Sequence, residues 1–161
     1  MSKQNSCHKI ISGGQTGVDR GALDAAIRHG FPCGGWCPEN RLAEDGIIPG
    51  KYPLTELING NYSDRTKKNV EDSDGTLIIY NGTLAGGTLL TVETARKLNK
   101  AVFLNNCSLS SHKSSVTETS KWISEKNIKV LNVAGPRQSE WDEGYMISLE
   151  IIGSLIKNFS N

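Results

Sequence analysis

The chain has 161 residues, of which 37% are hydrophobic and 22% charged, and its net charge is +1. This length suits a single domain, spanning residues 1–161, that can bury a core of its own. Its 18 basic residues are spread along the chain rather than clustered, so we expect no bulk nucleic-acid binding.

Apolar runs rich in β-branched residues alternate with segments of helical period along the whole chain. In order, we expect a strand at 9–12, a helix at 19–29, a strand near 31–35, a long loop at 36–61, a helix at 62–72, a strand at 76–80, a helix at 88–98, a strand at 101–104, a helix at 115–126, a strand at 129–133 and a helix ending near 159. This alternation predicts a Rossmann-like, three-layer α/β domain, with a mostly parallel sheet of about five strands and helices on both faces. We expect the first strand to be central, since the turn after it is the richest in glycine.

Three helix starts carry a capping-box pattern. Ser115 and Glu118 would open one helix, and Ser139 and Asp142 would cap the last one. Thr16 and Asp19 show the same spacing, so Asp19 is either a cap or a ligand-binding group.

The last helix is apolar around about half of its circumference. Its two stripes are formed by Tyr145, Leu149, Ile152, Ile156 and Phe159, and by Ile147, Ile151 and Leu155. Packing on one sheet face normally requires less apolar surface than this. We therefore expect a homo-oligomer, a dimer or a tetramer, with burial beneath the long loop as the alternative.

Cysteine usage and the polar N-terminus indicate a protein of the cytoplasm. Cys33 and Cys37 have a zinc-like spacing, but no second close pair follows and the three histidines are scattered. We expect no structural metal, and reduced thiols instead. No apolar run has the length of a secretion signal or of a membrane span, so we expect no membrane association.

Two glycine-rich turns, at 12–21 and 82–88, each follow an expected strand and precede an expected helix. A third turn, Gly135-Pro136-Arg137, follows the last strand. Glycine lets the backbone approach a ligand closely, while free N–H groups and the helix dipole favour an anion. Neither turn has the dinucleotide or the Walker pattern, which disfavours ordinary NAD binding and nucleotide hydrolysis. The turns therefore predict a site for a small anionic ligand such as a phosphate.

The carboxyl ends of parallel strands share one edge of the sheet, so these turns should converge there. Arg65 and Asn69 would share one side of the 62–72 helix, with Arg65 nearer the crevice. Arg20, Arg41, Arg65 and Arg137 are the candidates for an anion clamp, and Trp36 is a candidate platform for a flat ring. The candidate binding residues are Gly13, Gly14, Gln15, Thr16, Gly17, Asp19, Arg20, Gly35, Trp36, Arg41, Arg65, Gly82, Gly86, Gly87, Thr88, Gly135, Arg137 and Ser139.

Structural roles are open for some of these residues. Trp36 could belong to the core, and Gly21 could simply allow a close contact between helix and sheet. Arg41, Glu44 and Asp45 could form a solvated loop surface.

Several motifs in order along the chain resemble the molybdenum-cofactor carrier family, the circularly permuted YpsA-like branch of the SLOG superfamily. They are GGQTGVDRGALD at 13–24, GWCP at 35–38, RLAEDGIIP at 41–49, YPL at 52–54, RT at 65–66 with NV at 69–70, and NVAGPR at 132–137. The superfamily includes LOG-type phosphoribohydrolases, whose signature is a helix arginine, a strand and then G-G-x-G-T-x-x-E. Arg65, the 76–80 strand, Gly86, Gly87 and Glu93 reproduce that layout, while Leu89 and Leu90 replace the second Gly and the Thr.

The resemblance implies two alternative functions. The first is a carrier that binds the molybdenum cofactor (molybdopterin), with the pterin ring on Trp36 and the phosphate on the glycine turns. The second is an enzyme that cleaves the N-glycosidic bond of a nucleoside monophosphate, in which Glu93 and Arg65 would be the catalytic residues.

Overall fold

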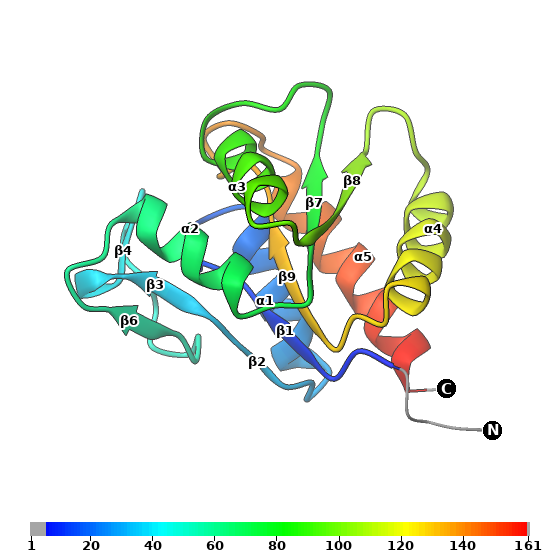
Figure 1. Ribbon diagram of the computed structural model, residues 1–161, viewed down its shortest axis with the longest axis horizontal. Helices are drawn as coiled ribbons and strands as arrows, with labels where there is room; N and C mark the ends of the chain where they lie inside the picture. The colour runs from blue at the N-terminus through cyan, green and yellow to red at the C-terminus, as the bar shows by residue number, and fades with distance from the viewer. Residues whose placement is uncertain (1–5, 161) are drawn as a thin grey trace.

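The computed structural model describes residues 6–160 and contains a five-stranded sheet in which every pairing is parallel (Figure 1). The strand order is β2-β1-β9-β7-β8. These strands are β1 (Lys9–Ile11), β2 (Cys33–Gly34), β7 (Gly75–Tyr80), β8 (Ala101–Asn106) and β9 (Val130–Ala134). The Rossmann-like α/β expectation is confirmed, but the first strand is not central. That place belongs to β9, which pairs with β1 on one side and with β7 on the other.

Helices cover both faces of this sheet. They are α1 (Val18–Arg28), α2 (Tyr62–Glu71), α3 (Gly86–Lys97), α4 (His112–Glu125) and α5 (Gly144–Phe159). On one face α5 contacts α1, α4 and β7, while on the other α3 contacts α2, β7 and β8 (Figure 1). All six residues of β7 are buried, as a strand covered on both faces requires.

The apolar surface of α5 is used inside the chain. Ile151, Ile152, Leu155 and Ile156 are buried in the main core cluster together with residues of α1, α4 and the sheet. Because α1 and α4 both pack on this helix, its wide apolar surface is needed within the chain. The apolar surface of α5 therefore no longer supports a homo-oligomer, which stays a prediction.

The expected capping boxes are wrong at all three helices. Helix α4 begins at His112, and its cap is Ser111, whose hydroxyl accepts a hydrogen bond from the Ser114 N–H at 3.1 Å. Helix α5 begins only at Gly144, with no side-chain cap. Gly17 precedes α1, also with no side-chain cap. A capping box is present at α2, where none was expected. The Asn61 side chain accepts a hydrogen bond from the Asp64 backbone N–H, and the Asp64 side chain accepts one from the Asn61 backbone N–H.

The segment at 36–61 is more ordered than the long loop that we expected. It contains β3 (Trp36–Pro38) paired with β6 (Thr55–Leu57), a short 3-10 turn η2 (Glu39–Arg41), and the hairpin of β4 (Leu42–Ala43) and β5 (Gly46–Ile47). Ile48 and Tyr52 of this segment are buried against Leu23 of α1. The hairpin is therefore anchored on the same helix that begins at the first glycine turn.

Two further observations concern membranes and metals. Between residues 6 and 160, no helix is long and apolar enough to cross a bilayer. All four cysteines are free thiols, and the described part of the chain holds no group of three or more His, Cys, Asp or Glu residues suited to a metal ion.

Candidate functional site

A small pocket lies where the glycine turns converge at the carboxyl edge of the sheet. Its lining comes from the turn after β1, the first turn of α2, the first turn of α3 and the turn after β9. The sequence-predicted residues that line it are Gln15, Asp19, Arg65, Gly87, Thr88, Gly135 and Arg137. The structure therefore brings together one residue or more from each predicted turn.

Gln15 lines this pocket, and its side-chain amide has a donor without a partner among the described residues. Its Oε1 accepts hydrogen bonds from the backbone N–H groups of Thr16, at 3.1 Å, and of Glu44, at 2.9 Å. Since only the amide oxygen can accept from two N–H groups, the orientation of the amide is determined. Gln15 is only 5% exposed, and its Nε2 is buried with no hydrogen-bond partner among the described residues.

Arg65 supplies a second donor without a partner. Its Nη1 lies 3.6 Å from Oδ2 of Asp19, while its Nε is buried and unpaired within residues 6–160. The guanidinium lies directly on the backbone of Gly13, where an added Cβ would be 1.8 Å from Nη1. Gly13 is therefore required by the position of Arg65 rather than by a turn conformation.

Asp19 holds Arg65 in place from the first turn of α1. Burial raises the pKa of the Asp19 carboxyl, and the Arg65 guanidinium and the Gln15 N–H oppose that rise. Oδ2 accepts the Gln15 N–H at 3.1 Å. Asp19 is thus a buried counter-ion for Arg65, and it bonds the turn before the helix in place of a Thr16 cap.

The outer part of the pocket is cationic and aromatic. The guanidinium of Arg137 lies 6.0 Å from the ring centroid of Tyr62, and its Nε lies 3.4 Å from Oε1 of Glu140. Gly87 and Thr88 form the first turn of α3, and a Cβ added at Gly87 would meet nothing within 4 Å. The positive end of the α3 dipole therefore faces open space in the pocket.

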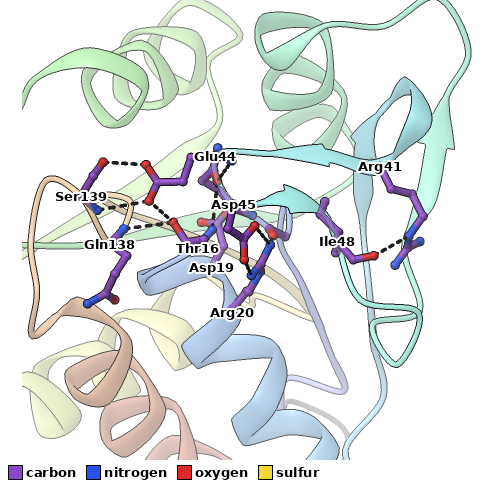
Figure 2. Close-up of polar contacts among 11 residues, drawn as sticks. Thr16, Asp19, Arg20, Arg41, Glu44, Asp45, Ile48, Gln138 and Ser139 are labelled. Atoms are coloured by element: carbon purple, nitrogen blue, oxygen red, sulfur yellow. Dashed lines mark hydrogen bonds and ion pairs between the residues drawn. The ribbon is translucent and has the colours of Figure 1, made fainter.

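Arg41 is not part of this site. Its Nε donates to the carbonyl of Ile48 at 3.1 Å (Figure 2). Its other nitrogens donate to the carbonyls of Pro49, Tyr52 and Leu54. These bonds hold the turn at 48–54 together. The expected role of Arg41 in an anion clamp is therefore replaced by a structural role.

The β4–β5 hairpin is hydrogen-bonded to its neighbours through Arg20, Thr16 and Ser139 (Figure 2). Arg20 makes a two-pronged ion pair with Asp45, at 2.5 and 2.8 Å, and its Nε donates to the Gly14 carbonyl. Glu44 accepts hydrogen bonds from the hydroxyl groups of Thr16 and Ser139. We call these contacts of Glu44 and Asp45 the hairpin clasp. The residues of the hairpin clasp line a separate, shallow hollow and not the pocket.

The clasp depends on two ionised carboxylates. Burial raises the pKa of Glu44, but the hydrogen bonds from Ser139 and Thr16 outweigh it and hold the pKa below its usual value. The hydrogen bonds from Arg20 lower the pKa of Asp45. The backbone N–H of Glu44 also fixes the Gln15 amide, so the clasp helps to orient a pocket residue.

Trp36 also lies outside the pocket. Its Nε1 donates to Asp72 at 2.7 Å, and Nζ of Lys68 lies 5.4 Å from its ring centroid. It lines a different hollow, with Lys9 and Gly35 among the other residues there. The backbone of Gly35 approaches that of Ser12 so closely that an added Cβ would be 2.1 Å from the Ser12 carbonyl oxygen. Gly35 therefore packs on the start of the first glycine turn, but neither Gly35 nor Trp36 lines the pocket.

The remaining glycines on the candidate list do not line the pocket. Gly14 has a φ of +79°, and its Cβ would lie 2.3 Å from Cδ1 of Leu54. Gly17 has a φ of +82° and packs against the Pro136 carbonyl. Gly82 and Gly86 also have positive φ, but neither lines the pocket.

Comparison with known proteins identifies the family of this chain. Residues 10–156 match the model of the "Circularly permutated YpsA SLOG family". The chain belongs to this family. The crystal structure of a "Putative molybdenum carrier protein" from Syntrophus aciditrophicus SB is 44% identical in sequence, with a TM-score of 0.92, and the match covers 94% of this chain and 96% of that one. No curated protein matches the chain.

Within this SLOG fold, Glu93 lies outside the pocket. It is exposed on α3 and does not line the pocket, whose carboxylates are those of Asp19 and Glu140. The geometry therefore offers no support for acid or base catalysis by Glu93.

Sequence reasoning missed six residues of the pocket. They are Tyr62, Thr66, Leu90, Thr91, Ala134 and Glu140. Tyr62 precedes Arg65 by three residues on α2, so helical spacing could have placed it on the same side. Leu90 lies three residues after Gly87 in the first turns of α3 and could have been found in the same way.

Proposed function

We propose that this SLOG protein is a binding or carrier protein for a phosphate-bearing small molecule, which it holds in the pocket between α2 and α3. The observation that carries the proposal is the pair of buried donors that have no partner between residues 6 and 160, Nε2 of Gln15 and Nε of Arg65. A buried donor without a partner costs about 1 to 3 kcal/mol, which a ligand acceptor would recover.

Hydrogen-bond donors and a helix dipole around the pocket support an anionic ligand. The guanidinium groups of Arg65 and Arg137 are paired with Asp19, at 3.6 Å, and Glu140, at 3.4 Å, but Arg65 keeps an Nε without a partner among the described residues and Arg137 is about a third exposed. The first turn of α3 adds the positive end of a helix dipole. A phosphate group is an acceptor with several oxygens, so it can satisfy these donors together.

The molybdenum cofactor is the ligand that we propose. Its phosphate would be held by Gln15, Arg65 and the start of α3, with its pterin ring toward the outer part of the pocket. The name of the 44%-identical structure, which refers to a molybdenum carrier, supports a molybdenum-related ligand. The four free thiols favour a reducing compartment such as the cytoplasm as the setting.

Native mass spectrometry of freshly purified protein tests this proposal, with Gln15→Glu as the variant. The substitution keeps the shape of the side chain and the oxygen that accepts from Thr16 and Glu44, but it turns a negative oxygen toward the pocket. We expect the wild-type protein to retain a small anion and the variant to lose it.

Gln138→Glu is the matched control, since it makes the same change on a nearby loop outside the pocket. Retention of the anion by both variants would contradict the proposed site. An empty wild-type protein that also binds neither hydroxymethylpterin phosphate nor a nucleoside monophosphate in calorimetry would contradict the proposed function.

The exposed position of Glu93 leads us to expect no glycosidase activity through this residue. Wild-type protein incubated with nucleoside monophosphates should release no free base, as followed by chromatography. Base release by the wild-type protein that disappears in Glu93→Gln would instead support the hydrolase hypothesis.

A further inference from the structure

Two exposed apolar side chains flank the mouth of the anion pocket. Tyr62, on the first turn of α2, is 40% exposed, and Leu90 of α3 is 36% exposed. Both line the same pocket as Gln15 and Arg65. The lining therefore combines buried hydrogen-bond donors with an apolar, partly aromatic rim.

We infer that the pocket selects phosphates attached to a flat heterocyclic ring, with Tyr62 as the platform on which that ring stacks and Leu90 as a further apolar contact of the ring. The inference rests on the proposed binding of a phosphate-bearing ligand, and it assigns a specificity-determining residue to that site. An inorganic anion or a plain sugar phosphate would use the donors but leave both rim side chains exposed to water.

The ring of Tyr62 already carries a flat group on its face. The planar guanidinium of Arg137 lies 6.0 Å from its centroid. A ligand ring between the two would need about 7 Å, twice the contact distance of about 3.5 Å. Arg137 would therefore move outward by about 1 Å, which its exposure and its single ion pair with Glu140, at 3.4 Å, allow.

The alternative platform, Trp36, is unsuitable on this geometry. A cation lies near both rings, Lys68 at 5.4 Å from the Trp36 centroid and Arg137 at 6.0 Å from the Tyr62 centroid, so location decides against Trp36. It lines a hollow that shares no residue with the anion pocket. Tyr62 is instead three residues from Arg65 on the same helix, so phosphate and ring can be bound from adjacent turns.

Calorimetric titration with GMP, hydroxymethylpterin phosphate and ribose phosphate tests this inference. The first two compounds carry a flat ring, and the third does not. Stacking of a base on an aromatic side chain corresponds to roughly a 5- to 150-fold difference in affinity. We expect a ring-bearing phosphate to bind the wild-type protein more tightly than ribose phosphate by a factor in that range.

The variants separate stacking from general damage to the site. Tyr62→Ala should abolish the preference for the ring while leaving ribose phosphate affinity within about twofold, and Tyr62→Phe should keep the preference because the ring remains. Leu90→Ala should reduce it, whereas Leu109→Ala, at a position 84% exposed and outside the pocket, should leave it unchanged.

Equal binding of all three compounds to the wild-type protein, or an unchanged preference in Tyr62→Ala, would overturn the role of Tyr62 and leave the anion site standing. Failure of every compound to bind would instead overturn the proposed function, and this inference with it.

Discussion

Arg41 and Arg65 are both half-buried, and both were candidates for the same anion clamp, but their hydrogen bonds differ. Arg41 donates to four backbone carbonyls of the turn at 48–54. Arg65 has one ion pair, with Asp19 at 3.6 Å, and a buried Nε with no partner in the described chain. A guanidinium whose donors are satisfied internally holds a loop together, whereas one with an unsatisfied donor beside a pocket is available to a ligand.

The largest effect is expected from Gly13→Ala, because the added Cβ would overlap the Arg65 guanidinium. The end of a flexible side chain can swing away, so the fold should survive while the site loses its arginine. We expect affinity for hydroxymethylpterin phosphate to fall by about 10- to 150-fold, the equivalent of a charge-assisted hydrogen bond. Gly50→Ala, where a Cβ meets nothing within 4 Å, is the control. Unchanged calorimetric affinity in Gly13→Ala would mean that Arg65 does not bind the ligand.

Arg65→Lys should have a smaller effect on the same affinity. An ammonium group can still neutralise Asp19, but it lacks the Nε donor and the planar fork. We expect about a tenfold loss of affinity with little change in melting temperature. A variant that binds as tightly as the wild-type protein would show that only the charge of Arg65 matters.

Arg41→Ala should lower stability and leave ligand affinity nearly unchanged, which is the opposite of what we expect for Arg65→Lys. Four carbonyl groups would lose their donor, so we expect the free energy of unfolding in urea to fall by about 1 to 3 kcal/mol. Ligand affinity measured under folding conditions should stay within about twofold. A large loss of affinity in a fully folded Arg41→Ala protein would remove the contrast between the two arginines.

The smallest effect is expected from the hairpin clasp, and it depends on pH. The pKa of Glu44 is lower in the fold than its reference value of 4.5, so its stabilising effect is complete above that pH and is lost as the pH falls through the folded pKa. Glu44→Gln should therefore lower the melting temperature slightly at neutral pH, and the difference from the wild-type protein should shrink as the pH falls below 4.5. A difference that persists at low pH would mean that the clasp does not act through the carboxylate.

The order of strands and helices was readable from the sequence because it depends on local patterns. The apolar run of β7 and the helical spacing from Tyr62 to Glu71 lie within a few residues of what was expected. The convergence of the glycine turns followed from the geometry of parallel sheets, which places all carboxyl ends at one edge.

What the sequence did not reveal depends on contacts between distant segments. Ser139 looked like a helix cap, but its hydroxyl bonds to Glu44, 95 positions away in the chain. Trp36 looked available for the ligand until its bond to Asp72, just after α2, and its place in a separate hollow were known. Whether an arginine is free depends on where the surrounding carbonyls lie, and no local pattern encodes that.

The position of β9 has a consequence for the synthesis of this chain. This strand follows β8 and α4 in the chain, yet it joins β1 to β7. Until residues 130–134 have emerged, a nascent chain can form the β2-β1 and β7-β8 pairs only as two separate halves, each with an open hydrogen-bonding edge. Late, long-range pairing of this kind slows folding and prolongs the exposure of such edges. The interval between translation of β8 and of β9 is therefore the time when this protein most needs protection by chaperones.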